Sequence, residues 1–243
     1  MSSKLIGVGV GPGDPELVTV KGVNALRAAE VVVVPVMDTG ERGRAEATVL
    51  HYVPGEKVLR VVFALTERSD RGRREAAWDA AGARVADLLG RHATVAFATI
   101  GDPNVYSTFT YLAHTIGELV PGTVVETVPG ITAMQDLAAR SGAVLTEGTE
   151  PLTLVPVTAG AAVLKDALNG PGTVVAYKFG RQAREVAEAL RDSGRIDDAV
   201  WGSALGLEDE SIRPAGDLDG EPLPYLSTLI APARRDGKRG GKL

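Results

Sequence analysis

The chain has 243 residues and a formal net charge of −5, so its overall charge would not attract nucleic acid or an anionic membrane. Hydrophobic residues make up 44% of the chain and charged residues 23%, as is usual for a globular protein with a substantial core. There is no cysteine, which excludes disulfide bonds, thiolate metal ligands and a cysteine nucleophile.

The N-terminal residues and the apolar runs of the chain indicate the localisation of the protein. The first five residues lead straight into an apolar segment and lack the layout of a signal peptide. The longest apolar run, residues 31–36, is far too short to cross a bilayer. His51, His92 and His114 have no helical ligand spacing, so no metal site is expected. We therefore expect a cytoplasmic protein.

Short apolar segments alternate with helix-like segments, which favours an α/β architecture. In the first half, strands are expected at residues 5–10, 31–36, 57–63 and 93–98, and helices at 17–26, 75–89 and 111–119. The pattern restarts near residue 120, with strands at 124–128, 152–156, 173–177, 199–205 and 227–231 and helices at 132–140 and 181–191. We predict two α/β domains, residues 1–119 and 120–233, with a cleft between them. A polar, glycine-rich tail at residues 234–243 is expected to be disordered.

The tripeptide Gly-Asp-Pro occurs twice after an apolar run, at residues 13–15 and 101–103. Asp is a preferred helix N-cap and Pro fits the first helical position, so each copy is expected to start a helix. Turns from strand to helix also line the carboxyl edge of an α/β sheet, where ligands bind. A local structural role therefore does not exclude a ligand contact.

The glycines of the first loop match neither common phosphate-binding pattern. Gly7, Gly9, Gly11 and Gly13 occupy every second position, whereas a dinucleotide-binding loop needs G-x-G-x-x-G. Pro12 removes one N–H that a phosphate would use, and no P-loop sequence occurs. A nicotinamide-dependent oxidoreductase therefore remains only as a disfavoured alternative.

Three segments, in order, resemble motifs of the tetrapyrrole (corrin and porphyrin) methylases, which use S-adenosylmethionine. They are GVGPGDPELVT at residues 9–19, GDPNVY at 101–106 and VPGITA at 128–133. The resemblance implies two α/β domains, the cofactor in the cleft between them, a tetrapyrrole substrate and a homodimer. Tyr-Ser-Thr at residues 106–108 and the helix at residues 75–81 are similar to those of precorrin-2 C20-methyltransferases. Sibling methylases that act on another carbon, on the cobalt-bearing substrate or on uroporphyrinogen stay open, as does a tetrapyrrole carrier without turnover.

The resemblance also implies which residues contact the cofactor. Three motif loops supply Pro12, Gly101, Asp102, Thr132 and Ala133, with Asp102 accepting from the ammonium group of the ligand. Strand ends of the second domain supply Tyr177, Lys178, Ala204 and Leu205, with Pro224 and Tyr225 as weaker candidates. Four candidate residues have a structural alternative: Asp102 and Thr132 as helix caps, Tyr106 as core packing, and Tyr177 as an ordinary strand aromatic.

The implied reaction transfers a methyl group from the sulfonium to C20 of precorrin-2 and needs alignment and exclusion of water. A proton must leave the methylated carbon, and Asp102 and Tyr106 are the candidates for a base, although a protein base is not required. Arg42 and Arg44 follow a strand end and are candidates for binding substrate carboxylates. A run of charged residues is expected to be a solvent-exposed segment that leads into a helix. It contains Arg68, Arg71, Arg73 and Arg74.

Overall fold

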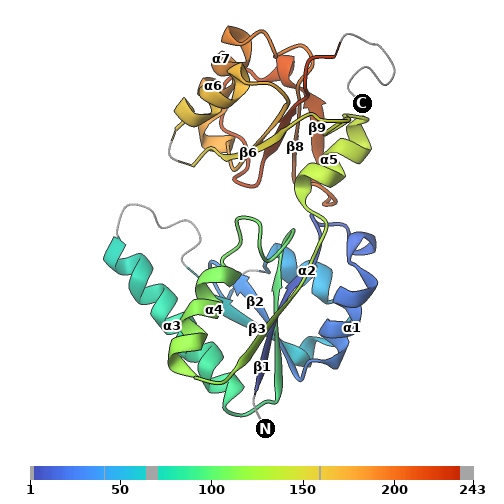
Figure 1. Cartoon of the computed structure of the whole chain (residues 1–243). Helices are drawn as coiled ribbons and strands as arrows, with labels where there is room; N and C mark the ends of the chain where they lie inside the picture. Colours follow the sequence, from blue (N-terminus) through green and yellow to red (C-terminus); the bar gives the residue numbers. More distant parts are fainter. Residues whose placement is uncertain (1–2, 41, 64–70, 159, 236–243) are drawn as a thin grey trace. The chain divides into compact units, whose positions relative to one another are not determined.

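The computed structural model of the chain describes residues 3–40, 42–63, 71–158 and 160–235. The chain forms two compact units, Met1–Thr132 and Ala133–Leu243, each with its own sheet (Figure 1). We describe each unit by itself.

The first unit is built on a five-stranded parallel sheet. In sheet order its strands are β3 (Val58–Val62), β2 (Val31–Val36), β4 (Thr94–Thr99), β1 (Lys4–Gly9) and β5 (Val124–Val128). Because all five strands run in the same direction, their carboxyl ends meet at one edge of the sheet. Strand β1 pairs with β4 on one side and with the edge strand β5 on the other, which brings the loops after these three strands together.

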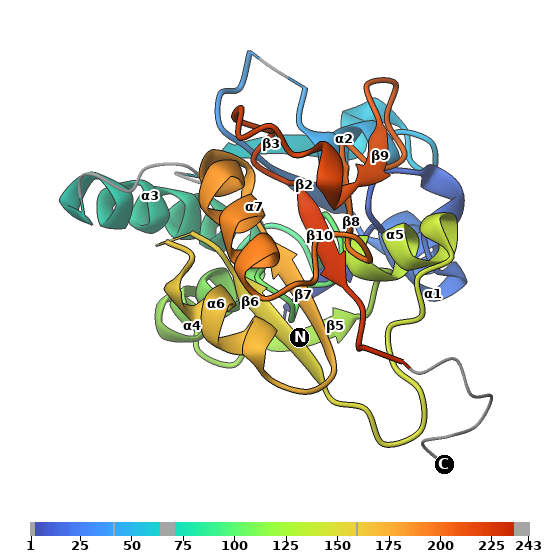
Figure 2. The same ribbon diagram turned by 90° about the horizontal axis from the view of Figure 1, so that it is seen from above.

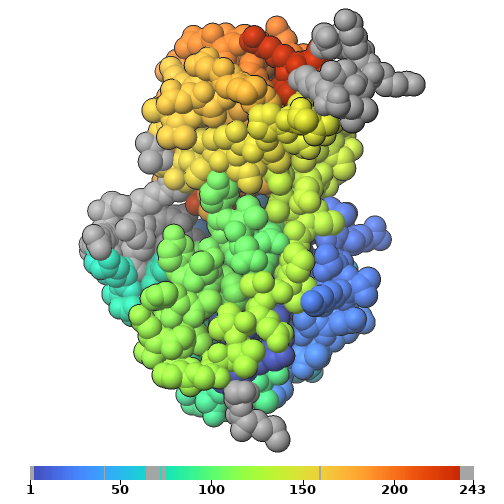
Figure 3. Space-filling view, in the orientation of Figure 1, coloured from blue at the N-terminus to red at the C-terminus, as the bar shows by residue number. Residues whose placement is uncertain are grey.

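Helices cover both faces of this sheet. They are α1 (Val20–Ala28), α2 (Arg44–Val49), α3 (Arg71–Leu89) and α4 (Phe109–Leu119), with short 3-10 helices at Pro15–Leu17 and Gly55–Lys57. Along β2, Val32 and Val34 join the core under α1 and α2, while Val33 joins the core under α3 and α4. This alternation follows from the two-residue period of a strand and explains why the run is apolar throughout. Figure 3 shows the face that carries α4 and the edge strand β5.

The second unit has a mixed sheet with the strand order β6 (Leu152–Pro156), β7 (Thr173–Tyr177), β10 (Thr228–Ala231), β8 (Val200–Ser203) and β9 (Ser211–Pro214). Strands β6 and β7 are parallel, and the other pairs are antiparallel. Helices α6 (Ala162–Asn169) and α7 (Ala183–Asp192) pack on one face, and α5 (Ala133–Ser141) packs on the other (Figure 2). Two 3-10 helices, Gly180–Gln182 and Ala215–Asp217, complete the unit.

The α/β fold is confirmed, and several predicted details differ. The sequence placed a boundary near residue 120, but β5 pairs with β1, so the first compact unit extends to Thr132. The prediction missed α2, α6 and β9, which are only six, eight and four residues long. Arg234 and Arg235, expected in a disordered tail, donate to the Ser193 carbonyl and to the Glu150 carboxylate. Residues 236–243 lie outside the described part.

Candidate functional site

Three glycine loops pack against one another at the carboxyl edge of the first sheet. The backbone N–H of Gly101 donates to the carbonyl of Gly11 at 2.8 Å and joins the loops after β4 and β1. A Cβ atom on Gly9 would lie 2.5 Å from the carbonyl oxygen of Gly101, and one on Gly130 would lie closer still. The three predicted motifs therefore meet at separations that only glycine permits.

Asp102 ties two of these loops together. Its Oδ1 accepts from the backbone N–H of Asn104 at 2.8 Å, and its Oδ2 accepts from the backbone N–H of Gly130 at 3.0 Å. The expectation that Asp102 caps a helix is wrong, because α4 begins only at Phe109 and its N-cap is Thr108. Both carboxylate oxygens are engaged with the backbone, so Asp102 serves first to fix the shape of the loops.

The first Gly-Asp-Pro copy behaves differently from the second. Asp14 does cap a helix, because its side chain accepts from the backbone N–H of Glu16 at 2.8 Å. That helix is the short 3-10 turn Pro15–Leu17, and α1 has its own cap at Thr19. Pro12 lies in the loop that precedes this turn, next to Gly11, which has a φ of 76°.

The Tyr-Ser-Thr segment forms a tight turn after the second loop. Tyr106 has a left-handed backbone, with a φ of 50°, and its side chain is partly exposed. Ser107 Oγ lies 3.0 Å from Thr99 Oγ1 and accepts from the backbone N–H of Phe109, so it fixes the turn between β4 and α4. Burial raises the pKa of the Tyr106 hydroxyl above its ordinary value of 10.0. At neutral pH this hydroxyl is therefore protonated and is a hydrogen-bond donor, not a base.

In the described part of the chain, three non-glycine residues have a left-handed backbone: Tyr106, Lys178 and Ala204. Each is one of the sequence-predicted site residues, and each follows the carboxyl end of a strand. A left-handed conformation costs a non-glycine residue about 1–2 kcal/mol. Backbone strain of this kind is concentrated at functional sites, where the conformation serves the function and so offsets its cost.

The candidate residues of the second unit gather at one edge of its sheet. Thr228 of β10 pairs with Tyr177 of β7 on one side and with Gly202 of β8 on the other. The carboxyl ends of β7 and β8, and the left-handed residues Lys178 and Ala204 that follow them, therefore lie at the same edge. The Nζ atom of Lys178 lies 5.7 Å from the centroid of the Tyr225 ring, which places this weaker candidate there too. Pro224 is next to Tyr225 in the chain.

A buried apolar cluster lies next to this edge. Tyr177 and Leu205 are buried in one hydrophobic cluster with Leu137 of α5, and Ala133 packs against it. The Tyr177 hydroxyl accepts from the backbone N–H of Met134 at 3.2 Å, which anchors the first turn of α5 to β7. Tyr177 is thus both a core residue and part of the candidate site.

The structure brings the predicted residues together as two groups, one in each unit. Pro12, Gly101, Asp102 and Tyr106 belong to the loops of the first unit, with Thr132 near Gly101, and the second group is Ala133, Tyr177, Lys178, Ala204 and Leu205. That both groups face one cofactor stays a prediction. Sequence reasoning did not anticipate the hydrogen bonds of Asn104, Ser107 and Met134, because most of them involve backbone groups, which leave no spacing pattern.

Arg42 and Arg44 lie at the start of α2, at the carboxyl edge of the first sheet. Thr48 of α2 donates to the carbonyl of Gly13 at 3.1 Å, which fixes this helix to the first glycine loop. Arg42 is exposed and Arg44 is partly exposed, and within the described residues neither is held by an ion pair. Of the charge run, Arg68 lies outside the described part, as do the side chains of Arg71, Arg73 and Arg74.

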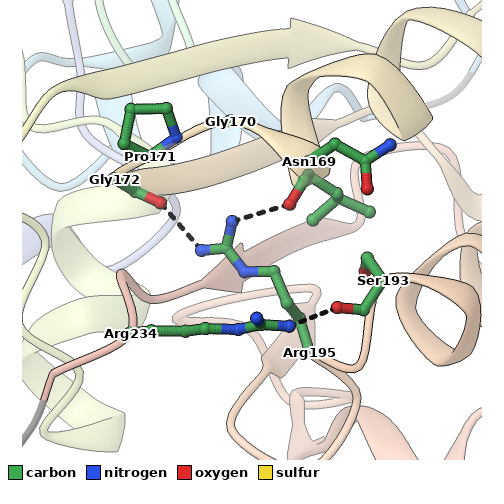
Figure 4. Close-up of a pocket in the computed structure, with 8 residues that line it drawn as sticks. Asn169, Gly170, Pro171, Gly172, Ser193, Arg195 and Arg234 are labelled. Atoms are coloured by element: carbon green, nitrogen blue, oxygen red, sulfur yellow. Dashed lines mark hydrogen bonds between the residues drawn. The ribbon is translucent and has the colours of Figure 1, made fainter.

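A pocket of about 330 Å³ lies at the opposite edge of the second sheet, next to Gly172, where β7 begins (Figure 4). Arg195, which is 4% exposed, donates there to the carbonyls of Leu168, Gly172 and Ala231. Burial lowers the pKa of its guanidinium group. The arginine joins the ends of α6, β7 and β10, so its role is structural and separate from the candidate site.

The described residues include no cluster of three or more His, Cys, Asp or Glu side chains that would hold a metal ion. The helices within the described ranges are too short or too polar to cross a membrane.

Comparisons with known proteins agree with the motif resemblance. The family model described as "Tetrapyrrole (Corrin/Porphyrin) Methylases" matches residues 4–219. A Precorrin-2 C(20)-methyltransferase of Sinorhizobium sp is 32% identical over 96% of this chain and 96% of its own length. A Cobalt-precorrin-2 C(20)-methyltransferase of Salmonella typhimurium is 30% identical over 95% and 96%. The Thermus thermophilus uroporphyrin-III C-methyl transferase, solved with S-adenosylhomocysteine, has the same fold, with a TM-score of 0.66, 22% identity and coverage of 94% and 97%.

Proposed function

Because the chain belongs to the tetrapyrrole (corrin/porphyrin) methylases, we propose that it is an S-adenosylmethionine-dependent methyltransferase that methylates C20 of precorrin-2 in cobalamin biosynthesis. The observation that carries this proposal is the full-length similarity to the Sinorhizobium protein of that name. The Salmonella relative, whose name specifies cobalt-precorrin-2, supports the same ring carbon and favours the cobalt complex as the alternative substrate.

The residues of both groups fit the chemistry of S-adenosylmethionine. The amino-acid end of this cofactor needs polar partners, which the backbone groups around Gly101 and Asp102 supply. Its adenosine end needs largely apolar surroundings, and Ala133, Tyr177 and Leu205 belong to an apolar cluster next to the candidate edge of the second unit. When bound, the cofactor supplies a methyl group that is already activated by its positively charged sulfur.

The chain's own residues then have three tasks: to align the two reactants, to exclude water and to bind the substrate carboxylates. Asp102 aligns by holding the loops of Gly101 and Gly130 together. Tyr106, protonated at neutral pH, is suited to donating a hydrogen bond and not to removing a proton. We therefore assign neither residue the part of general base.

The substrate would be a large tetrapyrrole that carries several carboxylates. Arg42 and Arg44 stand at the start of α2, which Thr48 fixes to the first loop, and their guanidinium groups suit carboxylates. The sequence predicts a cytoplasmic protein and the family resemblance predicts a homodimer, and light scattering of the purified protein would check the dimer.

Incubation with precorrin-2 and S-adenosylmethionine tests the proposal. We expect one equivalent of S-adenosylhomocysteine and a tetrapyrrole that has gained one methyl group in place of a hydrogen. Parallel reactions with cobalt-precorrin-2 and uroporphyrinogen III separate the alternatives within the family. Absence of transfer to every tetrapyrrole would reject an enzyme of this kind and favour a carrier. Tight binding of NAD in a calorimetric titration would favour the oxidoreductase.

A further inference from the structure

An ion pair holds the loop between β8 and β9 against α5. Arg140 of α5 makes two parallel bonds to the carboxylate of Glu210, with Nη1–Oε2 at 2.5 Å and Nη2–Oε1 at 2.6 Å. The same Oε2 atom accepts from the backbone N–H of Gly206 at 2.7 Å. Bidentate contacts of this kind fix orientation as well as distance.

The loop that Glu210 holds contains two of the predicted cofactor residues, Ala204 and Leu205. It is wound into two short turns, in which Leu207 N donates to the carbonyl of Ala204 at 3.0 Å and Glu210 N donates to that of Leu207 at 3.1 Å. The first turn is strained, because Ala204 is left-handed with a φ of 50°. Such a conformation persists only where the surroundings impose it.

A second carboxylate lies near Arg140. Asp136, which is 6% exposed and lies one helical turn earlier on α5, has its Oδ2 3.8 Å from Arg140 Nη1. The side chain of Arg140 is 38% exposed and that of Glu210 is 22% exposed, so water screens this pair only in part. The guanidinium group therefore lies between two carboxylates, one on its own helix and one at the end of the loop.

We propose that Arg140 and Glu210 are positioning residues for the cofactor: they hold the left-handed Ala204 turn in the conformation that contacts S-adenosylmethionine. The pair need not touch the ligand, because it acts through Gly206 and the turn before it. This inference rests on the proposed function, since it assumes that Ala204 and Leu205 line the cofactor site.

Substitution of Glu210 by Gln tests the proposal, because Gln keeps the size of the side chain and has one acceptor oxygen where the carboxylate has two. If that oxygen takes the place of Oε2, it still accepts from Arg140 Nη1 and Gly206 N, but the amide NH2 then faces Arg140 Nη2, so the second bond and the charge of the pair are lost. We expect the Kd of S-adenosylhomocysteine, measured by calorimetry, to rise about tenfold, which corresponds to about 1.4 kcal/mol. The KM for the tetrapyrrole should change less than twofold. Arg140→Lys keeps the positive charge but loses the bidentate contact of the guanidinium group. We expect it to raise the Kd by a smaller factor, about threefold.

Glu150→Gln is the matched control, because it breaks another bidentate pair of the second unit. Glu150 binds Arg235 through both carboxylate oxygens, and it precedes β6 at the edge away from Tyr177. Because the Glu150 side chain is 2% exposed and that of Glu210 is 22% exposed, we expect at least as large a loss of melting temperature, with less than a twofold change in Kd. Hydrogen exchange of the free protein should be faster at residues 204–207 in Glu210→Gln only.

Two results would overturn the inference. One is that Glu210→Gln and Glu150→Gln have the same Kd for S-adenosylhomocysteine while the wild-type protein binds it. That result rejects the inference but not the proposed function. The other is a wild-type protein that binds no S-adenosylhomocysteine, which rejects the proposed function along with the inference. If Glu210→Gln does not fold, the comparison of Arg140→Lys with Glu150→Gln decides in the same way.

Discussion

The carboxylate of Asp102 accepts a hydrogen bond from the backbone N–H of Gly130 at 3.0 Å, across 28 residues of sequence. Its other oxygen holds the turn that leads to Asn104, so one side chain fixes two of the three motif loops. The second Gly-Asp-Pro is therefore a connection between loops, whereas the first is the start of a short helix.

Replacement of Asp102 should weaken both the fold and cofactor binding. Asp102→Ala loses two bonds to a charged acceptor, and we expect the free energy of unfolding to fall by about 2–4 kcal/mol. Asp102→Asn keeps one acceptor oxygen and should lose about half as much. Denaturant unfolding measures the stability, and calorimetry with S-adenosylhomocysteine measures the affinity. A melting temperature equal to that of the wild type would contradict the role of Asp102 as a link between loops.

The contact between Gly130 and Gly101 has no room for a side chain. We expect Gly130→Ala to cost more than about 3 kcal/mol of stability, because a Cβ there would overlap the Gly101 carbonyl and push the loops apart. Gly117→Ala is the control: this residue lies within α4, with nothing within 4 Å of an added Cβ. It should stabilise the protein by about 0.5–1 kcal/mol through helix propensity. Equal effects of the two substitutions would show that the loops are not packed as described.

Because Ala204 has a left-handed backbone, its substitution by glycine should change the stability of the protein unusually little. Ala204→Gly loses about 0.8 kcal/mol of methyl burial but is relieved of about 1 kcal/mol of strain, so stability should change by less than about 0.5 kcal/mol. Ala187 is equally buried but lies within α7, where glycine should cost roughly 2 kcal/mol from lost burial and helix propensity. A loss at position 204 as large as that at 187 would argue against the strained turn.

Much of this site was predictable because strand ends and glycine spacing are visible in the sequence. Residues 31–36 were expected as a strand and form β2. A continuous β-branched run is typical of a strand that is buried on both faces of a parallel sheet. The prediction that Asp102 caps a helix was wrong, because a short-range rule favoured a cap and its partner Gly130 is distant in the chain. The pair of Arg140 and Glu210 had no local signal at all, as the two residues lie 70 positions apart.

Arg42 and Arg44 should affect the substrate and not the cofactor. Replacement of both by Ala is expected to raise the KM for the tetrapyrrole about tenfold or more, because each exposed guanidinium group would pair with a substrate carboxylate. The Kd of S-adenosylhomocysteine should stay within twofold. Arg91→Ala provides the control, since this exposed arginine pairs with Asp87 near the amino end of β4. A KM for the double variant equal to that of Arg91→Ala would exclude the two arginines from substrate binding.

The ring carbon that receives the methyl group tests the central claim most directly. The protein would be incubated with precorrin-2 and S-adenosylmethionine that carries carbon-13 in its methyl group, and the labelled product would be examined by NMR. We predict a single labelled methyl group attached to C20. A labelled methyl on any other carbon, or no label in the tetrapyrrole, would contradict the proposed function.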